Sequence, residues 1–283
     1  MLELISEYAC FGGAQRFYSH HSEAIGLPMR FSVFLPPQTR GGKVPALFCL
    51  AGLTCTEETF MIKAGAQRSA AQQGLMLVAP DTSPRGANLP GEADSWDFGV
   101  GAGFYLDAIE TPWNKHYRMY SYVLELYELI VREFPVLPAN IGITGHSMGG
   151  HGALVLALRN PDLFKTVSAF APICAPSKCP WGVKAFTAYL GGEQENWQKY
   201  DASALMEQRH APFPSGILID QGLSDKFLPN QLFPHAFEAA CQTAQQPLEL
   251  RRHADYDHGY YFISTFIEEH IRFHHQKLGG IAR

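Results

Sequence analysis

The sequence predicts a single α/β domain over residues 1–283, with a mainly parallel central sheet covered by helices on both faces. Short, continuously apolar segments alternate with longer amphipathic ones, and this alternation favours parallel strands joined by helical crossovers. Continuous apolarity within a strand indicates that both faces of the sheet are covered. The chain contains no internal repeat, low-complexity tract or linker-like stretch at which it would divide. One domain is therefore expected, although a prior of about 150 residues per domain suggests two.

Composition narrows the class of protein. Apolar residues make up 46% of the chain and charged residues 17%, which excludes a disordered protein. The net charge of −5 does not favour a nucleic-acid partner, which would need clustered Lys and Arg. No apolar run approaches the ~18 residues of a membrane span, and the N-terminal residues do not read as a signal peptide. The six cysteines are too sparse for a disulfide scaffold, so we expect a cytoplasmic protein with no membrane partner.

The predicted elements follow in order along the chain. Strands are predicted where apolar and β-branched residues cluster, at 31–35, 46–50, 75–79, 141–144, 166–170, 217–220 and 248–251. Between residues 117 and 134, apolar side chains recur every three or four positions, which predicts an amphipathic helix. Pro135 and Pro138 are expected to end that helix. Further helical patterns cover 153–158 and 261–276.

The strongest local signal is the segment Gly145-His146-Ser147-Met148-Gly149, a complete G-x-S-x-G motif. It follows a predicted strand and precedes a helical run, which is the context of a nucleophile elbow. Such a turn strains the backbone of the serine, and side chains in place of the two glycines would collide with neighbouring chain. The elbow also places the serine at a helix N-terminus, where free N–H groups favour negative charge. Ser147 is therefore the predicted nucleophile; the alternative is a helix start capped by a serine.

A nucleophilic serine needs a base to take its proton and an acid to orient that base. In the α/β-hydrolase order the acid and then the histidine follow the serine, on loops after later strands. His258 lies in the loop after the last predicted strand, whereas His253 lies close to the strand itself, where a structural role is expected. Asp225 lies beyond a strand end and a glycine turn, whereas Asp220 is still within the strand and is expected to be a turn or capping group. His258 is therefore the predicted base and Asp225 the predicted acid.

We expect different roles for the other titratable groups of this region. Asp257 is too near His258 in sequence to orient its far ring nitrogen, but it can tune the site electrostatically. Three histidines of the final helical pattern are expected on its solvated surface, namely His270, His274 and His275.

Acyl transfer also needs two donors for the oxygen that gains charge. One is the N–H of Met148, the residue after the nucleophile, and the other comes from a loop after an early strand. Leu53 N–H is the predicted second donor, with Gly52 as the near alternative and an ordinary turn into the next helix as the other reading. Cys55, two residues further on, is expected to lie beside the site, where its modification would block the pocket, but not to be the nucleophile.

Further segments carry a resemblance to a known family. They are Phe11-Gly12-Gly13, Gly52-Leu53-Thr54-Cys55, the segments 79–86, 94–99 and 101–108, Gly145 to Gly150, Pro180-Trp181-Gly182, the segment 220–225, and Tyr256-Asp257-His258. Nearly end to end, the chain resembles the S-formylglutathione hydrolases, also called esterase D, which have the α/β-hydrolase fold. The family's nucleophile, acid and base map onto Ser147, Asp225 and His258, and its oxyanion donors onto Leu53 and Met148.

Two positions depart from the family's pattern. Gly259 stands where the family usually has serine after the histidine, and Ile109 stands where threonine is common. Neither departure removes a catalytic group, so they bear on rate or substrate range.

The resemblance implies hydrolysis of S-formylglutathione to glutathione and formate, a step of formaldehyde removal, through a formyl-serine intermediate. This thioester hydrolase would have carboxylesterase side activity, would need no metal or organic cofactor, and would form a homodimer or higher homo-oligomer. A general short-chain carboxylesterase with the same triad is the alternative, and a non-catalytic binding protein on a hydrolase scaffold is a further rival.

A physical expectation accompanies this function. A formyl group is the smallest acyl unit, so its pocket should be tight and walled by bulky side chains. Trp96, Phe104 and Trp181 are candidate walls, with core packing as the alternative for each. Basic groups are candidates to receive the two carboxylates of glutathione, namely Lys63, Arg85 and Lys226.

Overall fold

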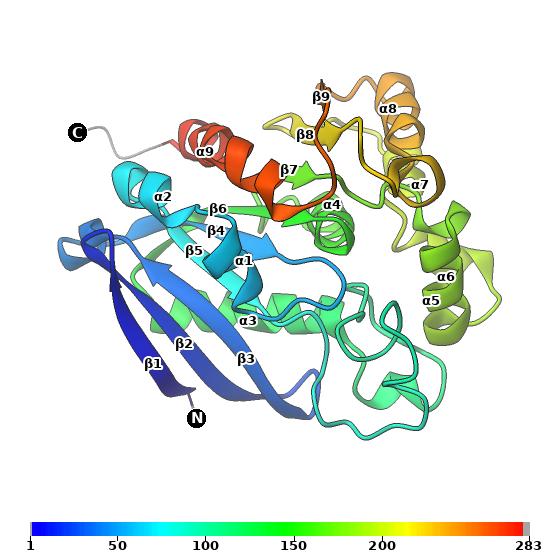
Figure 1. Cartoon of the computed structure of the whole chain (residues 1–283), viewed down its shortest axis with the longest axis horizontal. Coiled ribbons are helices and arrows are strands. Elements are labelled where there is room, and N and C mark those ends of the chain that lie inside the picture. Colours follow the sequence, from blue (N-terminus) through cyan, green and yellow to red (C-terminus); the bar gives the residue numbers. More distant parts are fainter. Residues whose placement is uncertain (1, 280–283) are drawn as a thin grey trace.

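A nine-stranded sheet runs through the computed structural model, which describes residues 2–279 (Figure 1). The strand order is β1-β2-β3-β5-β4-β6-β7-β8-β9. The pairs β1–β2, β2–β3 and β3–β5 are antiparallel, and the pairs from β5–β4 to β8–β9 are parallel. The strands are β1 Leu2–Cys10, β2 Gly13–Ser22, β3 Leu27–Leu35, β4 Val44–Leu50, β5 Met76–Pro80, β6 Val136–His146, β7 Thr166–Phe170, β8 Ile217–Gly222 and β9 Leu248–His253.

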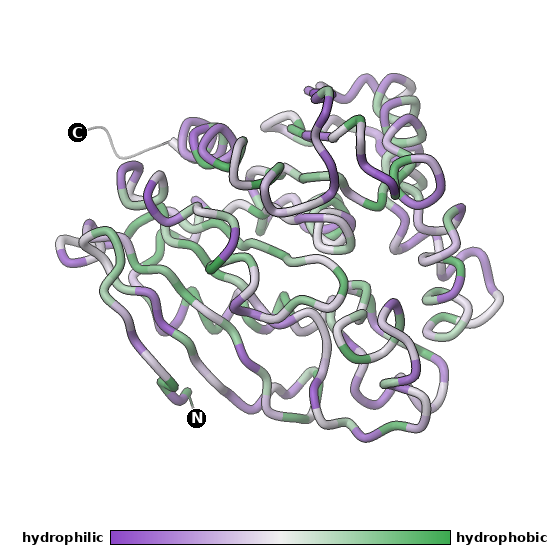
Figure 2. The backbone as a smooth tube through the Cα atoms, in the orientation of Figure 1, coloured by the Kyte–Doolittle hydropathy of each residue, from purple (hydrophilic) through white to green (hydrophobic). Residues whose placement is uncertain are grey.

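Apolar strands form the centre of this sheet. Every residue of β4, β5, β7 and β8 is buried, as expected where helices cover both faces. Figure 2 shows the hydrophobic colouring concentrated along these inner strands. The predicted strand 166–170 coincides with β7, and the other predicted strands overlap observed ones. The predicted fold class is confirmed.

Helices lie on both faces of the sheet. They are α1 Thr59–Lys63, α2 Gln67–Gln73, α3 Met119–Glu133, α4 Met148–Arg159, α5 Pro180–Leu190, α6 Gln194–Gln198, α7 Ala202–Glu207, α8 Pro234–Thr243 and α9 Tyr260–Lys277, with 3₁₀ helices at Pro37–Arg40, Trp113–Lys115 and Pro176–Lys178 and a π-helix at Leu228–Leu232. The helices α2 and α9 pack together on one face, and α3 and α4 lie on the other (Figure 1). None of the helices in the described part of the chain is long and apolar enough to cross a membrane.

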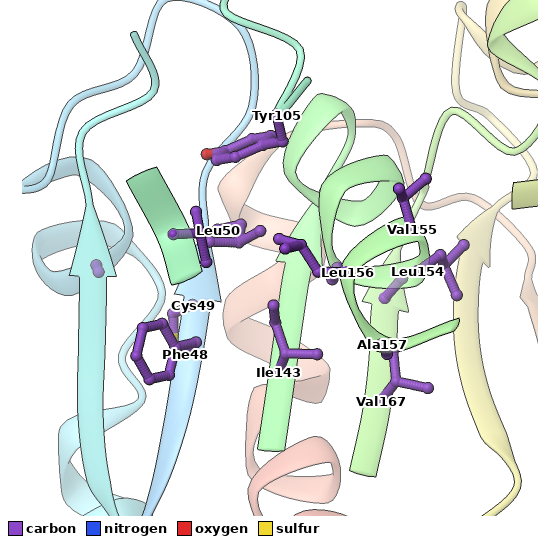
Figure 3. Packing of buried hydrophobic residues seen from close by; sticks show 14 of the residues in the cluster. Phe48, Cys49, Leu50, Tyr105, Ile143, Leu154, Val155, Leu156, Ala157 and Val167 are labelled. Carbon is purple, nitrogen blue, oxygen red and sulfur yellow. The ribbon is translucent and has the colours of Figure 1, made fainter. Parts of the chain in front are cut away.

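The packing under α4 fixes where that helix begins. Leu154 and Leu156 of α4 lie in one buried cluster with Ile143 of β6 and Val167 of β7 (Figure 3). Tyr105 closes the same region from a loop, and its hydroxyl donates to the carbonyl of Ala51 at 3.0 Å. Because α4 is held on several strands, the residue before its first turn has little freedom to move.

Two of the differences from the predicted elements concern strands. The hairpin β1–β2 was not predicted, because β1 is mostly exposed and shows no continuous apolar run. Pro138 was expected to close the preceding helix, but it lies within β6, because α3 ends at Glu133 and the strand begins at Val136. The register of β6 against β4 shifts between its pairings at Val136 and Ile141, and such an irregularity tolerates a proline.

Candidate active site

The turn between β6 and α4 holds Ser147 in a strained conformation. Its backbone has φ 59° and ψ −118°, a region that costs a non-glycine residue about 1–3 kcal/mol. A Cβ on Gly145 would lie 2.1 Å from the carbonyl oxygen of Gly149, and a Cβ on Gly149 would lie 2.1 Å from that of Leu50. Both glycines are therefore required, and the geometry is that of a nucleophile elbow.

The imidazole of His258 lies against the carboxylate of Asp225. Nδ1 of His258 is 2.5 Å from Oδ2 of Asp225, whose side chain is fully buried. The same carboxylate accepts a hydrogen bond from the backbone N–H of Phe227 at 2.8 Å and one from Nε2 of Gln221 at 3.3 Å. A carboxylate so held accepts from Nδ1–H, and this hydrogen bond assigns the tautomer that leaves Nε2 as an acceptor.

The loops that carry the acid and the base are joined backbone to backbone. A Cβ on Gly222 would lie 2.3 Å from the carbonyl oxygen of Tyr256, so only glycine permits the contact. The N–H of Ser224 donates to that same oxygen at 2.9 Å, and the N–H of Leu223 donates to the carbonyl of His253 at 2.9 Å. These contacts fix the two loops relative to each other.

The alternatives to this base and acid, His253 and Asp220, lie elsewhere in the structure. His253 is on β9, stacks on Phe266 with ring centroids 3.9 Å apart, and faces Asp220 rather than Asp225. Asp220 was expected to be a turn or capping group, and this is wrong. Its fully buried carboxylate pairs with Arg251 of the next strand through contacts of 2.5 and 2.6 Å. Burial alone would raise the pKa of Asp220, but hydrogen bonds from His270 and Arg251 outweigh it and hold that pKa well below its usual range.

The histidines of α9 also differ from expectation. His270 and His274, predicted on the solvated surface, are fully buried, whereas His275 is half-buried. His274 lies between the hydroxyls of Thr166 at 2.6 Å and Ser168 at 2.8 Å, and His270 lies 2.8 Å from the same Ser168 hydroxyl. Positions 270 and 274 are one turn apart, and that face of α9 packs on β7.

A cavity of about 110 Å³ joins the elbow to the acid–base pair. The predicted residues on its wall are Leu53, Cys55, Trp96, Ser147, Trp181 and His258, together with Gly52. Two further wall residues, His146 and Phe227, were missed by sequence reasoning. Their sequence positions could have indicated both residues, because His146 directly precedes the predicted nucleophile and Phe227 follows the predicted acid by two residues.

Aromatic rings form much of this wall. Trp96 and Trp181 meet edge to face with ring centroids 5.5 Å apart. Phe227 links them to the base, with its ring 4.7 Å from Trp181 and 5.0 Å from His258. Phe104 is absent from this wall and is fully buried in the core, so the core-packing alternative holds for it. The cavity is therefore narrow and bounded by rigid side chains.

The loop after β4 approaches the nucleophile closely. A Cβ on Gly52 would lie 3.2 Å from Cβ of Ser147, which brings the neighbouring Leu53 to the cavity wall. The carbonyl of Cys55 anchors this loop by accepting from Arg85 Nη2 at 2.9 Å. On the other side, Met148 is the first residue of α4, where a backbone N–H has no acceptor within the helix.

Burial sets the protonation of two groups beside the nucleophile. The ring of His146 lies 4.5 Å from that of His258 and is fully enclosed. Burial lowers the pKa of His146 well below its ordinary value, and charge on His258 lowers it further, so His146 stays neutral. Burial raises the pKa of the Cys55 thiol, which keeps it protonated and a poor nucleophile.

The three basic candidates for substrate contact differ in their surroundings. Arg85 already pairs with the buried carboxylate of Asp81 at 2.8 Å. Lys63 lies over the ring of Tyr260 at 5.9 Å, and Lys226 lies over the ring of Phe227 at 5.0 Å. Among residues 2–279, no group of three or more His, Cys, Asp or Glu side chains is arranged to hold a metal ion.

The sheet order, the elbow and the acid–base loops at the ends of the parallel strands define an α/β-hydrolase. A model of the Esterase family matches residues 22–273. The S-formylglutathione hydrolase of Rattus norvegicus is 55% identical over 98% of both chains, and that of Arabidopsis thaliana is 53% identical over 98% of both. A solved S-formylglutathione hydrolase from Agrobacterium tumefaciens superimposes with a TM-score of 0.94 at 47% identity, covering 98% of this chain and 99% of that one. The chain belongs to the Esterase family and, within it, to the S-formylglutathione hydrolases.

Proposed function

We propose that this chain hydrolyses S-formylglutathione to glutathione and formate through a formyl-Ser147 intermediate. The observation that carries this proposal is the aromatic-walled cavity that Ser147 and His258 both line. A cavity of about 110 Å³ accommodates a short acyl group such as formyl. The names of the relatives support the same substrate.

The residues have complementary roles in the proposed reaction. His258 takes the proton of Ser147 while the serine oxygen attacks the formyl carbon, and Asp225 orients the imidazole through Nδ1. The N–H groups of Leu53 and Met148 stabilise the oxygen that gains charge. The C–S bond then breaks, and His258 returns the proton to the departing sulfur, which yields glutathione. His258 next removes a proton from water, the hydroxide attacks the formyl-serine, and formate leaves as Ser147 recovers its proton.

The glutathione part of the substrate would lie outside this cavity. Lys63 and Lys226 supply two ammonium groups, each over a ring beside the site, that match the two carboxylates of glutathione. Arg85 contributes less, because its guanidinium already pairs with Asp81. Replacing Lys63 and Lys226 by methionine should raise KM for acyl-glutathione but not for an aryl ester; an equal effect on both substrates would contradict this assignment.

Replacement of the nucleophile tests the proposed function. Ser147→Ala should reduce kcat for S-formylglutathione by at least about 10⁴-fold, because no other hydroxyl replaces the nucleophile in such a site. Steady-state release of glutathione measures the rate, and circular dichroism checks the fold. Residual activity above a few per cent of wild type would exclude Ser147 as the nucleophile. As a second readout, a fluorophosphonate should label the wild type at Ser147; absence of labelling would favour a binding protein.

A short-chain carboxylesterase with the same triad is the second candidate. Exposed apolar side chains around the site favour it, since Leu223 lies on the acid loop and Tyr261 lies in the first turn of α9, three residues after His258. Comparison of kcat/KM for S-formylglutathione and a short aryl ester decides between the two. A higher value for the ester would reverse the order.

The assembly and the compartment are proposals of the same kind. An exposed edge strand, β1, with Leu4, Ile5 and Tyr8 open to solvent supports a homodimer or higher homo-oligomer. Sedimentation equilibrium would test this, and a monomer at micromolar concentration would contradict it. Six free cysteines fit a reducing compartment, so we propose the cytoplasm, which cell fractionation would check.

A further inference from the structure

One wall of the acyl cavity comes from a long loop rather than from the sheet or a helix. Trp96 lies between β5 and α3, in a segment with no long helix or strand of its own. Its side chain reaches the cavity although the residue is 55% exposed, whereas Trp181 opposite is buried in α5. The position of Trp96 therefore depends on what holds its loop against α5.

Residues on both sides of Trp96 are bound to one lysine of α5. The ammonium of Lys184 lies 2.6 Å from Oδ1 of Asp97 and donates to the hydroxyl of Ser95 at 2.8 Å. Ser95 also donates to Asp97, so the three side chains form one connected group, the Lys184 latch (Ser95, Asp97 and Lys184). Although burial alone would raise the pKa of Asp97, hydrogen bonds from Lys184 and Ser95 lower it, so the carboxylate stays charged.

The latch and the ring contact act on the same face of α5. Lys184 and Trp181 are three residues apart and therefore lie on adjacent turns of one helix face. The triplet 95–97 therefore contacts α5 in two ways. The indole of Trp96 packs on that of Trp181, and the polar side chains on either side of Trp96 bind the ammonium of Lys184.

The chain beyond the triplet is anchored independently of the latch. The N–H of Gly99 donates to the hydroxyl of Tyr189 at 3.0 Å, and the N–H of Val100 donates to the carbonyl of Glu92 at 2.8 Å. A Cβ on Gly99 would lie 2.1 Å from that carbonyl oxygen, so this part of the loop is tightly packed. Loss of the latch therefore frees the triplet 95–97 without unfolding the whole loop.

We propose that Lys184 is a positioning residue that holds Trp96 against the acyl cavity and thereby limits the size of the acyl group that Ser147 accepts. The proposal rests on the proposed function in that Ser147 is taken as the nucleophile. A formyl group needs no more room than the latched cavity provides. A butyryl group extends further along the wall that Trp96 forms, where the latch opposes displacement of the indole.

Replacement of the lysine tests the latch through acyl selectivity. The experiment measures kcat/KM for S-formyl-, S-acetyl- and S-butyrylglutathione, and for p-nitrophenyl acetate and butyrate, in wild type and Lys184→Met. The butyryl-to-formyl and butyryl-to-acetyl ratios should rise about tenfold or more in the variant, while kcat for the formyl substrate changes less than threefold. Lys184→Arg should keep the wild-type ratio. Lys178→Met, at an exposed lysine just before α5, is the matched control and should leave the ratios unchanged.

The salt dependence of the acyl selectivity distinguishes a positioning role of Lys184 from a general structural role. The latch is partly exposed, so 1 M NaCl should screen it and raise the butyryl-to-acetyl ratio of wild type, but not that of Lys184→Met. The leaving group is the same within each series, so salt effects on its binding cancel in the ratio. Asp97→Asn repeats the test from the other side of the ion pair, in case Lys184→Met does not fold.

The outcomes separate the latch from the proposed function. Unchanged ratios in both variants, or an equal loss on all acyl groups, would overturn the latch. Hydrolysis of the aryl esters without hydrolysis of any thioester would contradict the proposed substrate, and the ester series would still decide the latch.

Discussion

At the residue scale, the absence of a side chain at two glycines determines where Ser147 lies. Gly145 and Gly149 let three backbone segments meet around Ser147 at distances that no Cβ would permit. The serine itself has positive φ, so its conformation is held by its surroundings rather than by its own preference.

Gly149→Ala should destabilise the protein by about 3 kcal/mol or more, the upper end of the usual cost of overpacking. The added methyl would overlap the carbonyl of Leu50, which is backbone and has no room to yield. Urea denaturation measures the free energy of unfolding. Gly192→Ala is the matched control, because a Cβ there meets nothing within 4 Å, and it should be nearly neutral. Equal stability of the two variants would show that the elbow is more plastic than its geometry indicates.

At the scale of elements, a buried polar network joins β7, β8, β9 and α9. Nδ1 of His270 lies 2.8 Å from the hydroxyl of Ser168, Nε2 of His270 lies 3.3 Å from Oδ2 of Asp220, and all three side chains are fully buried. They are the residue types of a catalytic triad, but the cavity at Ser147 is lined by none of them. Their burial assigns them to holding α9 on the sheet, which in turn places the loop of His258 at the start of that helix.

Arg251→Met should cost about 3–5 kcal/mol of stability, because it removes the cation beside the buried carboxylate of Asp220. Arg272→Met on α9 is the control: its pair with Glu268 is exposed, so its loss should cost less than about 1 kcal/mol. Both values come from urea denaturation at pH 7. If the Asp220→Asn, Arg251→Met double variant is not more stable than Arg251→Met alone, the uncompensated charge is not the cause.

At the scale of the whole molecule, strands from both ends of the described chain join one sheet. We propose that the chain forms one domain, which calorimetry would show as a single unfolding transition; two resolved transitions would contradict this.

Stability should fall as the pH drops below about 6.5, the ordinary pKa of histidine in an unfolded chain. Within the described chain, burial lowers the pKa of five histidines in the folded state, to about 4 for His151 and in the same direction for His20, His146, His270 and His274. The unfolded chain therefore binds more protons below pH 6.5, and each histidine costs about 1.4 kcal/mol per pH unit until its folded pKa is reached. Above pH 7 neither state binds these protons, so their contribution is constant.

Thermal melts from pH 8 to pH 4.5 measure this effect. We expect a plateau in Tm above pH 7 and a fall of more than about 10 °C by pH 5. A flat Tm between pH 7 and pH 5 would show that these histidines are protonated in the folded protein.

Local sequence signals account for much of the fold and the candidate site. Continuous apolar runs identified the central strands, and the G-x-S-x-G motif with its strand–helix context pointed to Ser147. The hairpin β1–β2 was not predicted because an exposed edge strand lacks a continuous run of buried apolar residues. Its turn has positive φ at both Phe11 and Gly12. The burial of His270 and His274 depends on hydroxyls more than 100 residues away in sequence. The periodicity of α9 alone could not reveal such partners.

The positive φ of Ser147 has a consequence for how this chain can change over generations. Glycine at that position would relieve the strained turn and would be expected to raise stability while removing the nucleophile. Selection for a sturdier protein alone would therefore erase the serine. Under the proposed function, the serine at this position is kept for catalysis at a cost in stability.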